Sequence, residues 1–197
     1  MVKWLLPMLA SLWLTGCGDE IWRTEDVSEF MPPLDFELTD ENGRNVKAED
    51  YAGKTTLLYF GFTHCPDVCP ASLAGLAAAT RQIDEALRDD IQVLFVSVDP
   101  ARDTPDVLKR YTDIFGPQFI GLTGSTAQLD ELTNRYRVTY EYGEKDPEGN
   151  YDVRHSSAVF AFDSQGEAKL LIRDDDPIPA VAADLSRLAE RGASSES

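Results

Sequence analysis

The fold is decided by residues 55–70, which read TTLLYFGFTHCPDVCP. The first half of this stretch is an almost unbroken run of apolar and β-branched residues, which is typical of a strand buried on both faces of a sheet. Residues 71–87 are rich in Ala and Leu, with apolar spacings of three and four, and predict a helix that begins at the cysteine motif. A buried strand, a loop with two cysteines and a helix are therefore expected at the centre of the protein.

Strands and helices alternate on both sides of this unit. Asn42-Gly43 is a dipeptide that favours a tight turn, so residues 34–38 and 44–47 are expected to form an N-terminal β-hairpin. The alternation predicts an α/β fold in which helices cover both faces of a central mixed β-sheet. Further strands are expected at residues 91–98, 119–122, 157–162 and 168–172, helices at 105–115, 125–135 and 177–191, and a hairpin or loop between 140–142 and 151–153.

The composition limits both the size of the fold and the class of its partners. The chain has 197 residues, enough for one globular domain with its own core and a short targeting segment. Its 18 Lys and Arg residues against 35 Asp and Glu residues give a formal net charge of -17 at pH 7. A charge of this sign repels phosphate groups, so we expect no nucleic acid among the partners.

The N-terminus has the pattern of an export signal. Lys3 precedes an apolar run at residues 4–14, which is too short to cross a bilayer, since a spanning helix needs about 20 residues. Residues 14–17, LTGC, resemble the lipobox of bacterial lipoproteins, in which the cysteine is acylated; an ordinary secretory signal with an incidental Cys17 is the alternative. Both interpretations export the protein, and the first makes it a membrane-anchored lipoprotein that faces the periplasm. The expected segments are a signal peptide at 1–16, lipidated Cys17 and a tether at 17–32, a folded domain at 33–191 and a disordered tail at 192–197.

Cys65 and Cys69 are the pair that remains for chemistry. In an oxidising compartment such a pair can be a dithiol, a disulfide or part of a metal site. A helix N-terminus favours the thiolate form, and thiolates suit Cu(I) or zinc, but two sulfurs leave either metal in need of another donor. The sequence offers two histidines. His64 adjoins Cys65 and is expected to point elsewhere, whereas His155 lies in a distant loop that a long return of the chain can bring over the cysteines.

Three separate motifs carry a resemblance to a known family. Residues 61–70 read GFTHCPDVCP, residues 97–105 read SVDPARDTP and residues 153–156 read VRHS. Together they resemble the Sco/SenC family of copper-binding, thioredoxin-like proteins, and the resemblance extends over about residues 33–188. It therefore implies a thioredoxin-like form of the α/β fold.

The resemblance also implies a metal, a function and partners. In Sco/SenC proteins two cysteines and a distant histidine bind copper, which assigns Cys65, Cys69 and His155 as the metal ligands. The implied function is that of a metallochaperone rather than an enzyme, with a periplasmic copper chaperone as the donor. The copper would pass to the dinuclear copper centre of cytochrome c oxidase subunit II while the oxidase is assembled.

Two other functions and one other metal stay open. A thiol-disulfide oxidoreductase would use Cys65 and Cys69 as its redox-active pair, although redox motifs of this fold usually have two residues between the cysteines, and simple exchange gives His155 no task. A redox or copper sensor would instead change a protein contact with its metal state. Zinc also suits two thiolates and an imidazole.

Two features beside the proposed ligands need an interpretation. Family members often have an acidic residue directly before the histidine, where this chain has Arg154. A cation there can change partner docking or the affinity for oxidised copper, but it removes no ligand. Residues 99–105 end in Thr104-Pro105, which fit an N-cap and the first position of a helix, so the segment is either a turn with a helix cap or a support for the metal loop.

Overall fold

The structure is a computed structural model that describes residues 21–195. No helix within these residues is both long enough and apolar enough to cross a membrane. The strands are β1 (Glu25–Asp26), β2 (Glu37–Asp40), β3 (Asn45–Lys47), β4 (Thr55–Gly61), β5 (Ile91–Ser97), β6 (Phe119–Thr123), β7 (Tyr140–Tyr142), β8 (Val153–His155), β9 (Val159–Phe162) and β10 (Ala168–Ile172). The helices are the 3-10 helix η1 (Ala48–Tyr51) and the α-helices α1 (Val68–Gln82), α2 (Glu85–Arg88), α3 (Pro105–Thr112), α4 (Thr126–Arg135) and α5 (Ile178–Ser195).

Eight strands form one mixed sheet in the order β1-β10-β9-β4-β5-β6-β2-β3, and β7 pairs with β8 in a separate two-stranded sheet. Every residue of β4 and β5 is buried, as their apolar sequences predict, and the two strands run parallel. Strand β6 continues the parallel arrangement beside β5, while β9 pairs antiparallel with β4. The expected α/β fold with a central mixed sheet is confirmed.

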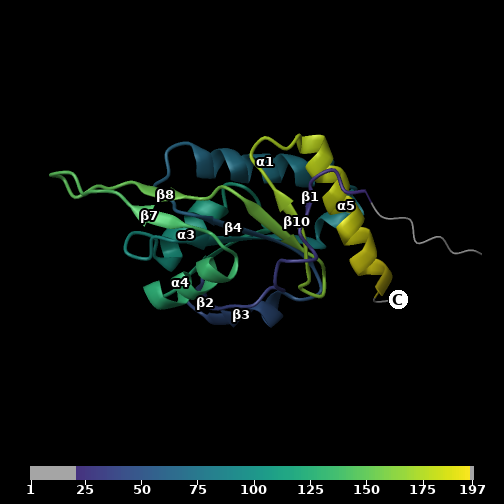
Figure 1. Cartoon of the computed structure of the whole chain (residues 1–197), viewed down its shortest axis with the longest axis horizontal. Coiled ribbons are helices and arrows are strands. Elements are labelled where there is room, and N and C mark those ends of the chain that lie inside the picture. Colours follow the sequence, from purple (N-terminus) through teal and green to yellow (C-terminus); the bar gives the residue numbers. More distant parts are fainter. Residues whose placement is uncertain (1–20, 196–197) are drawn as a thin grey trace, which may run out of the picture.

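Side chains that alternate along β4 divide the core into two layers. On one side, the ring of Tyr59 contacts Phe95 at 6.0 Å between centroids, and Phe95 contacts Tyr111 of α3. On the other side, Phe60 contacts Tyr136 at the end of α4. Figure 1 shows α1 and α5 side by side along one face of the sheet, with α4 across the sheet from them. The cysteine motif at the start of α1 therefore lies at the carboxyl end of the central strand β4, in a sheet that is covered on both faces.

The turn between β2 and β3 forms where the Asn42-Gly43 dipeptide predicts it. Gly43 has a φ of +76°, a left-handed conformation that glycine adopts at little cost. The carboxylate of Asp40 accepts hydrogen bonds from the backbone N–H groups of Asn42 and Arg44 at 2.9 and 2.8 Å. The guanidinium of Arg44 also lies 2.7 Å from this carboxylate. The expected N-terminal hairpin is thus closed by its own side chains.

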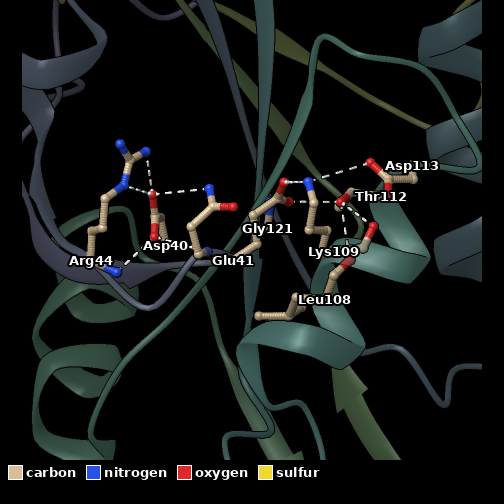
Figure 2. Close-up of polar contacts among 9 residues, drawn as sticks. Asp40, Glu41, Arg44, Leu108, Lys109, Thr112, Asp113 and Gly121 are labelled. Atoms are coloured by element: carbon tan, nitrogen blue, oxygen red, sulfur yellow. Dashed lines mark hydrogen bonds and ion pairs between the residues drawn. The ribbon is translucent and has the colours of Figure 1, made fainter.

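A buried carboxylate joins this hairpin to the rest of the domain (Figure 2). Glu41 accepts hydrogen bonds from the backbone N–H of Gly121 in β6 at 2.7 Å and from the hydroxyl of Thr112 in α3 at 2.9 Å. The ammonium group of Lys109 lies 3.1 Å from the same carboxylate. Glu41 is only 7% exposed. If its carboxylate were removed, little water could reach the donors and accept their hydrogen bonds instead.

Part of the segment that is expected to be a tether belongs to the folded domain. Residues 17–32 are expected to form a tether, but Glu25–Asp26 pairs with Leu170–Leu171 as an edge strand, and Val27 is 1% exposed. The carboxylate of Asp184 in α5 accepts hydrogen bonds from the backbone N–H and the hydroxyl of Thr24. An edge strand this short needs few buried residues, so its polar sequence gives no period to detect.

Two helix boundaries also differ from the prediction. Residues 71–87 are not one helix, because Ile83 is extended and buried and Asp84 starts α2 by accepting a hydrogen bond from the N–H of Ala86. The C-terminal helix continues to Ser195, well into the segment expected to be a disordered tail. The break between α1 and α2 consists of the buried Ile83 and the capping residue Asp84. It contains no glycine or proline, which are the residues that usually mark the end of a helix in a sequence.

Replacing Glu41 by Leu is expected to lower the free energy of unfolding by about 1–3 kcal/mol, because the buried N–H of Gly121 loses its acceptor, whereas the Thr112 hydroxyl keeps the Leu108 carbonyl at 3.0 Å. Urea unfolding measures the change. The matched control is Glu37→Leu on the same hairpin, where an exposed carboxylate lies 3.6 Å from an exposed Lys47 and little change is expected. Equal losses in the two variants would contradict the anchoring role of Glu41.

Candidate metal centre

Three separate parts of the chain bring the cysteines and the histidine together. Cys65 lies in the loop after β4, Cys69 lies in the first turn of α1, and His155 is the last residue of β8. Although His155 follows Cys69 by 86 residues, its Nε2 atom is 3.2 Å from the Sγ atom of Cys69. The ligand atoms of the three side chains all lie within 4.8 Å of one another. The structure therefore gathers the three residues that the sequence analysis singles out.

The two cysteines are free thiols whose sulfurs face the same point. The backbone N–H of Cys69 donates a hydrogen bond to the Sγ atom of Cys65 at 3.3 Å, and no disulfide joins them. Cys65 is partly exposed, whereas Cys69 is fully buried. One sulfur is thus accessible to an incoming group and the other is enclosed by the domain.

The enclosed sulfur packs directly against the backbone of β4. A Cβ atom at Gly61 would lie 2.8 Å from the Sγ atom of Cys69 and 2.7 Å from the ring of Phe95, so a side chain at this position would collide with both. Burial raises the pKa of the Cys69 thiol to about 12. The position at a helix N-terminus predicts a thiolate, but for Cys69 the loss of solvation outweighs the helix dipole, and the metal-free group is a neutral thiol at pH 7.

The imidazole of His155 is oriented by a backbone carbonyl and by aromatic rings. Its Nδ1 atom lies 2.9 Å from the carbonyl oxygen of Ser156, which assigns the ring proton to Nδ1 and leaves a lone pair on Nε2. The rings of Phe62 and Tyr59 stand edge-on to the imidazole, with centroids 5.8 and 6.2 Å away. The free nitrogen lone pair therefore points at the sulfurs, as a metal ligand requires.

Two sulfurs and one imidazole nitrogen are a donor set for a soft metal ion. Thiolates favour Cu(I) and zinc, and imidazole suits copper and zinc alike. Three donors complete a trigonal site, whereas a tetrahedral zinc site needs a further ligand. Within residues 21–195, this is the group of His, Cys, Asp and Glu side chains whose spacing fits a metal ion.

The comparison with protein families agrees with this geometry. The family model for SCO1/SenC matches residues 28–190. The chain belongs to the SCO1/SenC family. The match begins before β2 and ends within α5, so it includes all three members of the Cys65, Cys69 and His155 group.

Individual SCO1/SenC relatives are similar over the same region. The chain is 44% identical over 133 residues to the mitochondrial SCO2 homologue of Bos taurus and 40% identical over 134 residues to an SCO2-like protein of Rickettsia felis. These alignments cover 67% and 68% of this chain and 50% and 65% of the relatives, so the chain spans between half and two thirds of their length. The structure of Bradyrhizobium japonicum ScoI with copper bound superposes with a TM-score of 0.72 and 35% identity, covering 80% of this chain and 99% of that one. The thioredoxin-like Sco fold is thereby confirmed.

In this SCO1/SenC protein, the β7–β8 hairpin that carries the histidine is fastened to the loop after β5. The hydroxyl of Tyr142 donates to the carbonyl just before Asp99, and the hydroxyl of Tyr151 donates to the Asp99 carboxylate at 2.7 Å. The guanidinium of Arg102 pairs with Asp99, donates to the carbonyl of Tyr151 at 2.9 Å and lies 3.7 Å from the centre of the Tyr151 ring. Asp99 is 0% exposed, so these partners compensate a buried charge.

The same loop also supports the cysteines. The buried carboxylate of Asp103 accepts hydrogen bonds from the backbone N–H and the hydroxyl of Thr63, at 2.9 and 2.6 Å, and from the hydroxyl of Ser97 at 2.6 Å. Residues 99–105 are therefore both a turn that leads into α3 and a support for the metal loop. His64 lies beside Asp103, with its Nδ1 atom 3.6 Å away, and is not part of the group that holds Cys65.

Two further residues from the sequence analysis remain, and the structure describes one of them. Arg154 is exposed and precedes His155 in β8, so its side chain points to the opposite face of the strand. The proposed lipidation site, Cys17, lies outside residues 21–195, which are the residues that the structure describes. Arg154 therefore adds a positive charge near the site without blocking the imidazole.

The double variant Tyr142→Phe/Tyr151→Phe is expected to weaken Cu(I) binding about tenfold, because two hydrogen bonds that fix the hairpin are lost. Competition with a chromogenic Cu(I) chelator measures the affinity. The same two changes made in a His155→Ala background should leave Cu(I) affinity unaltered, because no imidazole remains to be positioned. A tenfold loss in both backgrounds would show that the tyrosines act on the cysteines instead.

Binding of Cu(I) should release a proton from the Cys69 thiol, since burial keeps its pKa far above neutral pH. This proton alone makes the apparent affinity rise about tenfold per pH unit between about pH 6 and pH 8. Chelator competition at several pH values gives the slope. Cys69→Ser should lower the number of protons released by one, and an unchanged slope in that variant would refute the assignment.

Proposed function

We propose that this protein binds copper through Cys65, Cys69 and His155 and delivers it to the dinuclear copper centre of cytochrome c oxidase subunit II during assembly. The observation that carries the proposal is the convergence of two sulfurs and one oriented nitrogen within 4.8 Å. Membership of the SCO1/SenC family, which takes part in the copper assembly of cytochrome c oxidase, supports the same assignment. Copper bound to the related Bradyrhizobium japonicum ScoI supports the choice of metal.

The arrangement of the ligands favours transfer over storage. The cysteines lie on one loop and helix turn, whereas His155 lies on a hairpin outside the main sheet. The hairpin can move away and expose the metal while both sulfurs still hold it. An incoming thiolate can then replace the sulfurs in turn, beginning with the accessible Cys65, so that copper passes between proteins without a free ion. This mechanism needs both cysteines in their reduced state.

The proposed location follows from the N-terminal sequence. Acylation of Cys17 would anchor the protein in a membrane, and residues 18–20 would separate that anchor from the first described residues. In the periplasm a copper chaperone would be the donor. A tethered carrier would find its membrane-bound acceptor by motion in two dimensions, which raises their effective concentration.

A second function is supported by the thiols themselves. Two free cysteines, one accessible and one buried, could reduce the disulfide of an oxidised copper centre, with the accessible Cys65 attacking and Cys69 completing a new disulfide. The raised pKa of Cys69 disfavours this chemistry at neutral pH, because the resolving group must be a thiolate. The oriented lone pair of His155 also has no task in such an exchange.

Replacing His155 by Ala is expected to weaken Cu(I) binding by at least about a hundredfold, since the trigonal site becomes a two-coordinate one. Oxidase activity in cells that express only this variant should fall and recover when copper is added to the medium. His64→Ala is the matched control, because it removes an imidazole next to the cysteines without removing a ligand.

Normal oxidase assembly by a His155→Ala variant that cannot hold copper would overturn the delivery function and favour thiol reduction. Equal effects of His64→Ala and His155→Ala on copper affinity would overturn the ligand assignment.

A further inference from the structure

A groove lies directly beside the cysteine loop, between the first turns of α1 and the connection from β10 to α5. Figure 1 shows the two helices, α1 and α5, side by side. Its volume is about 390 Å³. We call it the α1–α5 groove. Its apolar lining includes Val68, Ala71, Leu76, Ile172, Ile178 and Val181.

The groove contains large apolar side chains that remain exposed to solvent. Val68 is 42% exposed and Ile178 is 37% exposed, and both are among the large hydrophobic side chains that remain accessible within residues 21–195. They face a shared hollow rather than being scattered over the surface. Apolar side chains that line one concave site are typical of an interaction surface.

The rim of the groove is negatively charged. Asp67, Asp174 and Asp176 line it, and within the described residues none of the three forms an ion pair. Their contacts are with neutral groups: Asp174 accepts a hydrogen bond from the Ser72 hydroxyl at 2.9 Å, and Asp176 accepts one from a backbone N–H at 2.8 Å. The one cation of the lining, Arg173, is paired with a glutamate outside the groove. The groove therefore presents an apolar floor and a rim of uncompensated carboxylates.

The groove adjoins the cysteine loop. Asp67 and Val68 stand between Cys65 and Cys69 in the chain, so any segment that fills the groove also contacts the cysteine loop. A protein docked here is placed to receive or supply a metal held by Cys65.

We propose that the α1–α5 groove is the docking site for a basic segment of the protein with which this chain exchanges copper, and that an apolar side chain flanked by Lys or Arg enters the groove. This inference rests on the proposed function. The charge of the rim selects a cationic partner, and it disfavours both an anionic membrane surface and a second copy of this chain, whose net charge is also -17.

The test compares a groove variant, Asp176→Asn/Ile178→Ser, with a control variant, Asp113→Asn/Ile114→Ser. Both pairs remove one carboxylate, partly exposed at Asp176 and exposed at Asp113, and one exposed isoleucine. Ile114 is 74% exposed just after α3 and does not line the groove. Stopped-flow spectroscopy follows Cu(I) transfer from the copper-loaded full chain to two acceptors. One is the metal-free soluble domain of oxidase subunit II, and the other is a small Cu(I) chelator.

The groove variant is expected to slow second-order transfer to subunit II on the order of tenfold and to weaken its dependence on salt concentration. Its transfer rate to the chelator should equal that of the unaltered protein, because no ligand has changed. The control variant should transfer to both acceptors at the unaltered rate. Equal rates to subunit II for the groove variant and the unaltered protein would overturn the proposal.

A separate measurement distinguishes failure of the groove from failure of copper delivery. If the unaltered protein passes no copper to subunit II, the proposed delivery function is wrong. Binding of a basic segment to the groove is then tested on its own, by NMR titration with short peptides. A Lys-Leu-Lys peptide should shift the amide signals of Val68 and Ile178, whereas a Glu-Leu-Glu peptide should not, and the absence of any difference refutes the inference. Sedimentation that shows a dimer broken by the groove variant would make a second copy the occupant and would also refute it.

Discussion

The approach of one imidazole nitrogen to a buried sulfur is the constraint on which the rest of the structure depends. The Nε2 atom of His155 and the Sγ atom of Cys69 are 3.2 Å apart in space and 86 residues apart in the chain. The sulfur is held from within, against β4 at Gly61, while the imidazole arrives from outside the main sheet on β8. The domain as a whole is needed to define this one distance, although only three side chains form the site.

One segment of the chain serves both halves of the site. Asp99 binds the hairpin that carries the histidine, and four residues later Asp103 binds the loop that carries the cysteines. Both carboxylates are fully buried. Asp99 is paired with Arg102 of the same segment as well as bonded to Tyr151 of the hairpin, and Asp103 accepts hydrogen bonds from Ser97 of β5 as well as from Thr63 of the cysteine loop. Because a buried carboxylate is costly to leave without its hydrogen-bond donors, these contacts hold both halves of the site to one segment. This segment explains how ligands from distant parts of the sequence keep a common geometry.

The sequence predicts those features that depend on neighbouring residues. The buried strand β4, the turn at Gly43 and the start of α1 follow from apolar runs, turn residues and helix spacing, while the ligand set follows from a family resemblance. The contacts of Asp99 and Tyr151 could not be predicted, because a hydrogen bond between residues 52 positions apart leaves no periodic pattern. The neutral state of Cys69 also escapes prediction, since burial is a property of the folded domain. Alternating tyrosines at 140 and 142 were the available signal that the hairpin has a packed face.

The hairpin is a two-stranded sheet that projects beyond the main sheet (Figure 1). Such a ribbon has little stability of its own, so its position depends on the contacts of Tyr142 and Tyr151 with the loop after β5. The dwell time of a bound ion can therefore depend on how readily these local contacts break, without any unfolding of the eight-stranded core. Substitutions along this ribbon can lengthen or shorten that dwell time among homologues while the sulfur ligands and the overall thermal stability stay the same.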